Sequence, residues 1–139
     1  LTGGGLVARL VDVPGASHVV RGGACTYAVD TKASVLGVSE RQLASTGPVD
    51  EQVARQMARG TRELFRADIG VSTTGVAGPG PADGFPAGTV HIACAHPAGE
   101  EHRLLHLDGD RAAVRAGAID AAIALVRDVL DFAGAQAGD

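Results

Sequence analysis

The chain has 139 residues, 45% of them hydrophobic, and a formal net charge of −4, which suits one globular domain with a real core. Its basic residues are scattered and only 3% of its residues are aromatic, so we expect no nucleic-acid partner. No run of about 18 apolar residues and no basic-then-apolar leader occurs, so we expect a cytoplasmic domain without membrane partners.

A short helix is predicted near the start of the chain. Thr2 is expected to cap it and Pro14-Gly15 to end it, and the helix would run through the apolar residues of 6–11. The sequence opens on Leu1 and not on methionine, so we expect the natural protein to extend before it. We treat residues 1–139 as a single domain that a longer chain would contain.

A strand and two short helices are predicted next. Residues 19–29 are rich in β-branched and small side chains, which favours a strand. The strand would place Cys25 in the core, as a later strand would place Cys94, because free thiols usually behave as small buried hydrophobes. The two helical pieces are expected at 32–36 and 40–45.

An amphipathic helix is predicted from Asp50, because apolar positions alternate steps of four and three while arginines face away. These positions are Val53, Met57, Gly60, Leu64 and Ala67. A buried strand follows over 67–74. Residues 75–88 then form a loop with five glycines and three prolines, a composition typical of functional or disordered segments.

The last third of the chain predicts a hairpin and a long helix. Strands are expected at 89–95 and 102–107, and a helix that is apolar on most sides at 110–132, with a frayed tail after Gly134. Helices that alternate with strands before a late hairpin predict an α/β fold, a three-layer α/β/α sandwich with a mixed central sheet. The apolar helix also suggests a homo-oligomer.

Lysine and tyrosine each occur once, at Lys32 and Tyr27, against eleven arginines. Arginine stays protonated in proteins, whereas a partly buried lysine can approach neutrality and act as a general base. The lone lysine is therefore a candidate catalytic residue. The alternative is that a lysine-poor chain contains one lysine by chance, without a catalytic role, and that the tyrosine only ends a strand.

Two glycine-rich segments are candidate binding elements. In Thr2-Gly3-Gly4-Gly5, three glycines in a first helical turn are costly unless something approaches the main chain, whose free N–H groups could hold an oxyanion or phosphate. Gly75-Val76-Ala77-Gly78-Pro79-Gly80 follows the carboxyl end of a predicted strand, the usual side for ligands in α/β sheets. The alternatives are a flexible start and an ordinary surface loop.

Two cations lie near the start of the predicted last helix. Asp110 caps this helix, and Arg111 and Arg115 share one face close to its positive end, where the macrodipole disfavours them. A bound phosphate would resolve the conflict, and a local ion pair with Asp108 or Asp110 is the competing explanation.

The five histidines show no metal-ligand spacing. His102 and His106 share a face only as alternate strand residues, and His91 and His96 would point to opposite faces. We predict no metal and no cofactor.

Seven motifs, in order and with similar spacing from Leu1 to about Phe132, resemble the CinA C-terminal domain family, also described as competence/damage-inducible. The resemblance implies an amidohydrolase that deamidates nicotinamide mononucleotide, a pyridine nucleotide, in NAD recycling. The motifs are Thr2-Gly3-Gly4, Pro14-Gly15, Gly22-Gly23 through Tyr27 and Lys32, Leu36-Gly37-Val38, Thr74-Gly75-Val76-Ala77-Gly78-Pro79, Pro86-Ala87-Gly88-Thr89-Val90 and Gly109-Asp110-Arg111.

The resemblance also implies a catalytic serine outside the printed sequence. The family's first motif reads Glu-Ser-x-Thr-Gly-Gly, so the nucleophilic serine would immediately precede Leu1. Tyr27 and Lys32 would then activate it in a Ser-Lys arrangement.

The same resemblance implies roles in substrate binding. Main-chain N–H groups around Thr2 and Gly3 would hold the oxyanion, while Arg111 and the loop Gly75–Gly78 would hold the nucleotide. One departure concerns substrate: Phe85 stands where relatives often have lysine, which removes a cation beside the loop.

Two other functions remain as alternatives. A catalytically silent nucleotide-binding or assembly domain would follow if the residue before Leu1 is not serine. An enzyme that uses Cys25 as nucleophile is the second, although no activating histidine pair lies near it in sequence. Some members of the resembled family carry a molybdopterin-binding-like domain before this one, and others are free-standing.

Overall fold

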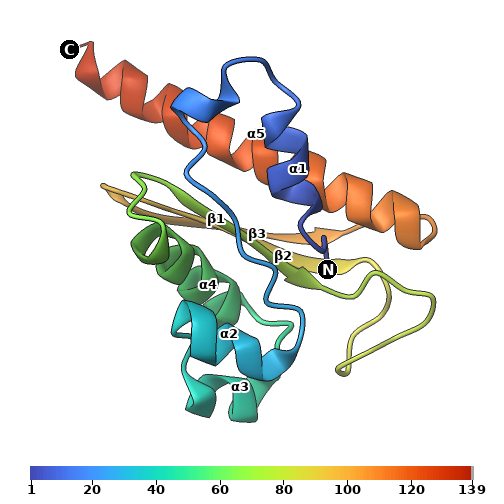
Figure 1. Cartoon of the computed structure of the whole chain (residues 1–139). Helices are drawn as coiled ribbons and strands as arrows, with labels where there is room; N and C mark the ends of the chain where they lie inside the picture. The colour runs from blue at the N-terminus through green and yellow to red at the C-terminus, as the bar shows by residue number, and fades with distance from the viewer. Residues whose placement is uncertain (139) are drawn as a thin grey trace.

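The computed structural model describes residues 1–138 and has three layers (Figure 1). Helices α1 (Gly5–Val11) and α5 (Arg111–Ala137) cover one face of the sheet, and α2 (Val29–Leu36), α3 (Glu40–Thr46) and α4 (Glu51–Leu64) lie on the other. The predicted α/β class with helices on both faces is confirmed. Among these residues, no helix combines the length and apolar composition that crossing a membrane requires.

The sheet has the order β1 (Gly70–Gly75), β2 (Thr89–His96) and β3 (Gly99–His106). Both strand pairs are antiparallel, so within residues 1–138 the sheet is antiparallel and not mixed as predicted. The reason lies in the connections: residues 76–88 return the chain without a crossover helix, and parallel neighbours need such a crossover. The predicted hairpin is confirmed, with a tighter turn at Pro97-Ala98.

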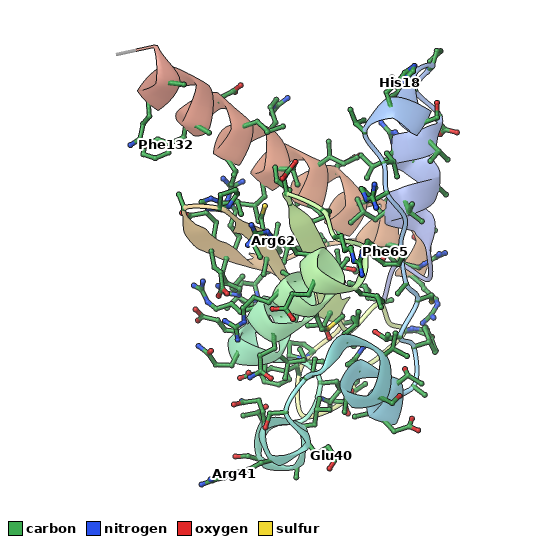
Figure 2. All side chains as sticks on the ribbon, turned by 60° about the vertical axis from the view of Figure 1, so that its left-hand side comes forward. His18, Glu40, Arg41, Arg62, Phe65 and Phe132 are labelled. Atoms are coloured by element: carbon green, nitrogen blue, oxygen red, sulfur yellow. The ribbon has the colours of Figure 1, made fainter. Side chains whose placement is uncertain are left out.

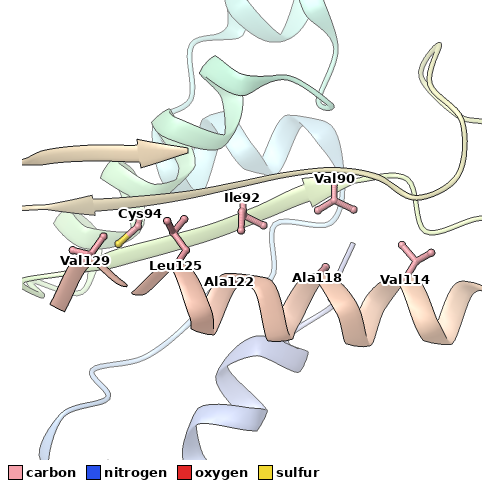
Figure 3. Close-up of a cluster of buried hydrophobic side chains, with 8 residues drawn as sticks. All are labelled: Val90, Ile92, Cys94, Val114, Ala118, Ala122, Leu125 and Val129. Atoms are coloured by element: carbon pink, nitrogen blue, oxygen red, sulfur yellow. The ribbon is translucent and has the colours of Figure 1, made fainter. Parts of the chain in front are cut away.

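The face toward α5 holds the largest apolar cluster of the domain (Figure 3). Alternate residues of β2 point to this helix, whose buried positions recur every three or four residues. Burial raises the pKa of the Cys94 thiol to about 11, so the prediction of an inert core cysteine fits. The cluster comprises Val90, Ile92, Cys94, Val114, Ala118, Ala122, Leu125 and Val129.

Helix α5 is longer than predicted, because it continues through Gly134 to Ala137 instead of fraying there. Its last turns pass beyond the other elements, and Figure 2 shows Phe132 on this part of the helix. That side chain is 63% exposed. Alanines around the glycine favour helix strongly enough to carry the chain past it.

The face toward α4 is filled by small side chains. Ala54 and Ala58 of the helix meet Ala93 and Ala95 of β2 in a separate cluster. The amphipathic helix is confirmed, and the Asp50 carboxylate accepts hydrogen bonds from two N–H groups of its first turn.

The strand predicted at 19–29 is wrong. Ala16–His18 forms the 3-10 helix η1, and residues 21–27 are irregular, with Cys25 exposed. Figure 1 shows this segment crossing from the layer of α1 to that of α2. A chain that crosses between layers cannot follow a sheet edge, so its β-branched residues have no neighbouring strand to pair with.

Candidate active site

A cavity of about 240 Å³ lies where α2, the connection before α4 and the loop after β1 meet. The loop leaves the carboxyl end of β1, as predicted. Six of the predicted site residues line this cavity together with Leu1: Tyr27, Lys32, Gly75, Ala77, Gly78 and Arg111.

Lys32 lies in the middle of α2 and is only 6% exposed. Its Nζ donates a hydrogen bond of 2.7 Å to the carbonyl oxygen of Thr26, and no carboxylate pairs with it among residues 1–138. Burial lowers the pKa of the Lys32 amine, partly offset by the nearby Cys25 thiol. Deprotonation to the neutral amine, which can accept a proton, therefore costs less free energy for Lys32 than for an exposed lysine.

Arg111 connects two walls of the cavity. One guanidinium nitrogen donates to the carbonyl oxygen of Gly78 at 2.7 Å, and another donates to the Tyr27 hydroxyl at 3.2 Å. The ion pair with Asp108 or Asp110, considered from sequence, is absent from the described residues. The cavity is thus lined by a cation that forms no ion pair with a carboxylate of residues 1–138, an arrangement that suits an anionic ligand.

Tyr27 is 64% exposed and is one of the residues that line the cavity. Its hydroxyl accepts a hydrogen bond from Arg111 and forms none with Lys32. The two singleton residues therefore line one cavity without a hydrogen bond between them.

The glycine loop is shaped by close backbone contacts. A Cβ on Gly75 would lie 2.4 Å from the carbonyl oxygen of Thr89, so a side chain does not fit there. Gly78 has a φ of 89°, in the left-handed region. The loop continues into a turn closed by a bridge between Ala82 and Phe85.

Sequence reasoning missed Asp83, the one carboxylate among the described residues that line the cavity. It has a φ of 53°, a conformation that Asp adopts more readily than most residues. The Asp-Gly pair at 83–84 is a turn signal, but it did not indicate that the turn borders a cavity. Phe85 is half-buried in the turn and does not line the cavity.

The other four predicted binding residues, Thr2, Gly3, Gly4 and Arg115, do not line the cavity. Thr2, Gly3 and Gly4 form the turn that follows Leu1, and Arg115 of α5 contacts this turn. Thr2 does not cap α1 as predicted: the N-cap is Gly4, and the Thr2 hydroxyl instead bonds the Thr73 hydroxyl at 3.0 Å. Gly3 and Gly4 have φ values of 61° and 88°, so the turn requires a conformation that glycine adopts readily.

A histidine pair outside the cavity was also missed. Nδ1 of His91 and Nε2 of His102 are 2.9 Å apart, and the rings stack with centroids 5.2 Å apart. His102 Nδ1 lies 3.7 Å from the Glu51 carboxylate. The signal that could have found this pair is the register of the hairpin, in which the two residues are diagonal neighbours.

A larger hollow of about 510 Å³ lies between α1 and residues 13–22. Its walls are mostly apolar, and Arg21 is the charged side chain in it. The reactive groups converge on the smaller cavity, which is therefore the candidate active site despite its size.

The family model of the CinA C-terminal domain matches residues 1–130. The chain belongs to this family. It is 48% identical over 130 residues to a CinA-like protein of Frankia casuarinae, covering 94% of this chain and 30% of that one. It is 41% identical over 129 residues to a putative competence-damage inducible protein of Desulforamulus reducens, covering 93% and 31%. The chain thus spans about a third of the length of these CinA relatives.

Solved structures of the CinA superfamily have the same fold. A protein from Klebsiella pneumoniae 700603 superposes with a TM-score of 0.90 at 34% identity, covering 94% of this chain and 82% of that one. One from Escherichia coli gives 0.88 at 33% identity, covering 92% and 75%. The CinA fold is therefore shared along nearly the whole chain.

Proposed function

We propose that this domain, in the cytoplasm, hydrolyses the carboxamide of nicotinamide mononucleotide to give nicotinic acid mononucleotide and ammonia. The nucleophile would be a serine directly before Leu1, as in the motif that the chain resembles. The observation that carries the proposal is Lys32, a buried lysine without a carboxylate partner that shares the small cavity with Leu1.

Lys32 would move protons through both halves of the reaction. Its neutral amine takes the serine proton as the oxygen attacks the carboxamide carbon, and the resulting ammonium returns a proton to the leaving nitrogen as the C–N bond breaks. Water then attacks the acyl-enzyme as Lys32 accepts one of its protons, and the Lys32 ammonium returns that proton to the serine oxygen as the ester C–O bond breaks. No redox partner is needed, and the products balance as carboxylic acid and ammonia.

The charge distribution around Leu1 supports this chemistry. Lys32 and Arg111 line the cavity together with Leu1, and Arg115 donates hydrogen bonds to the carbonyl oxygens of Leu1 and Thr2. A positive field at this position favours the alkoxide and oxyanion that develop on the neighbouring residue during acyl transfer. Arg111 at the cavity edge would hold the phosphate, with the glycine loop beside it.

The test is ammonia release from nicotinamide mononucleotide by the full natural protein, compared with its Lys32→Arg and Lys32→Met variants. We expect kcat to fall by about 10²–10⁴-fold in both, because a protonated or apolar side chain cannot act as base. Arg127→Lys, at an exposed arginine of α5, is the matched control and should keep the parental rate. Equal activity in folded Lys32→Arg would remove this lysine as the base.

Two further variants separate the binding groups. Arg111→Ala should raise KM for the mononucleotide more than it lowers kcat, since the phosphate is bound equally in ground and transition states. Tyr27→Phe should lower kcat if the hydroxyl assists the serine. No ammonia release by a parent that has the serine would indicate another amide substrate or a silent binding domain.

A further inference from the structure

One face of α5 organises the surroundings of Leu1. Arg111, Arg115 and Ile119 follow one another at four-residue spacing and therefore lie in one row along the helix. The first contacts the cavity loop, and the last packs so closely against α1 that a Cβ on Gly5 would lie 2.8 Å from it. Arg115 lies between them and faces the turn at Leu1.

Arg115 uses one edge of its guanidinium on two consecutive carbonyl groups. Its Nε donates to the Leu1 oxygen at 3.3 Å, and its Nη2 donates to the Thr2 oxygen at 3.0 Å. The side chain is half-buried and forms no ion pair with a carboxylate among residues 1–138. A partly desolvated cation whose donors are directed to backbone oxygens acts on backbone orientation more than on charge balance.

These two bonds fix two peptide planes. Because the peptide unit is planar and trans, holding the Leu1 carbonyl also sets the direction of the Thr2 N–H, and holding the Thr2 carbonyl sets that of Gly3. On the opposite side, the Thr2 hydroxyl is bonded to Thr73 of β1. The turn is therefore held between the last helix and the first strand.

We infer that Arg115 is a positioning residue that orients the backbone at Leu1 and Thr2, and with it the preceding nucleophile, toward Lys32. This inference rests on the proposed function, because it assumes that a nucleophile precedes Leu1. It differs from a phosphate-binding role, since Arg115 does not line the cavity. A lysine would not replace it, because a single ammonium cannot present two parallel N–H donors in a fixed plane.

The experiment compares Arg115→Met and Arg115→Lys with the parent in the full natural protein. Two rates are measured: ammonia release from nicotinamide mononucleotide, and covalent labelling by a fluorophosphonate, which reacts with activated serines whatever the natural substrate. We expect kcat and the labelling rate of Arg115→Met to fall on the order of a hundredfold, with KM within about twofold of the parent. Arg115→Lys should fall between parent and Met.

Arg127→Met serves as the control for removing an arginine from α5, and thermal unfolding verifies that each variant is folded. Parental kcat and labelling in a folded Arg115→Met protein would overturn the inference while leaving the proposed function intact. Labelling of the parent without ammonia release would overturn the proposed substrate, and the fall in labelling of Arg115→Met would still support the inference. A parent inert to both reagents would overturn both.

Discussion

The two faces of the sheet are filled by side chains of different size. Toward α5, β2 presents Val90, Ile92 and Cys94, which meet residues such as Leu125. Toward α4, the same strand presents alanines and His91, and β1 presents hydroxyl groups. The helix on the second face therefore approaches the sheet backbone closely, whereas the helix on the first is held off by branched side chains.

The two faces are therefore stabilised in different ways. On the α5 face, stability comes from apolar volume removed from water, so a loss of volume should be most damaging. On the α4 face, small residues let the helix and strand backbones approach closely, so an added side-chain atom should destabilise the fold most. Polar groups can be buried there because backbone carbonyls are near enough to accept their hydrogen bonds.

The largest effect is expected for Leu125→Ala, because this side chain is 2% exposed in the centre of the α5 face. We expect a loss of about 3 kcal/mol in the free energy of unfolding, from lost burial plus the cavity left behind. Urea unfolding measures it. The exposed Leu130→Ala is the control, and equal losses in the two variants would contradict the volume argument.

Gly70→Ala tests the α4 face in the opposite direction. The added Cβ would lie 2.2 Å from the carbonyl oxygen of Ala58, so helix and strand must separate. We expect a loss of about 2 kcal/mol in urea unfolding. Gly134→Ala, where nothing lies within 4 Å, should be neutral or stabilising; a neutral Gly70→Ala would mean that the layers yield easily.

Ser72→Ala tests the buried hydroxyl groups of the α4 face. The Ser72 hydroxyl donates to the carbonyl oxygen of Ala54 at 2.6 Å. Its removal should cost about 1 kcal/mol of unfolding free energy, the net value of one such hydrogen bond. Ser34→Ala, at an exposed serine, supplies the baseline. Equal unfolding free energies of the two variants would mean that packing alone, without this hydrogen bond, stabilises the face.

The smallest effect concerns the pH response of the same face. Burial lowers the pKa of His91 and His102, so the folded state binds fewer protons than the unfolded state. Their contribution is complete above the ordinary pKa of 6.5 and is lost as pH falls through the lower folded values. Unfolding midpoints from about pH 8 to about pH 5 should fall less in a His91→Gln, His102→Gln double variant. An unchanged slope would contradict this account.

Elements whose formation depends on residues within one segment were predicted correctly from the sequence. Helix α4 was found because its apolar spacing and the Asp50 cap are both within one segment. The strand predicted at 19–29 is absent from the structure, because β-propensity describes fit to a neighbouring strand and this segment has none. The sheet was predicted as mixed because strand direction depends on connections, not on composition.

For the candidate site, the sequence indicated which side chains belong to the site but not which groups they contact. The lone Lys32 and the misplaced charge of Arg111 and Arg115 stand out in the sequence, because each departs from what composition or the helix dipole favours. Most of their hydrogen-bond partners are carbonyl groups, those of Thr26, Gly78, Leu1 and Thr2. A carbonyl is present at every residue, so no sequence pattern marks it in advance.

The order of synthesis gives the row on α5 a further consequence. Arg111 and Arg115 belong to α5, the last element of this domain, and they hold segments that are synthesised before it. A nascent chain that ends before α5 has neither its apolar partner for β2 nor the bonds that orient Leu1. Chains that end before α5 should therefore be unstable, and under the proposed function they should also release no ammonia from nicotinamide mononucleotide.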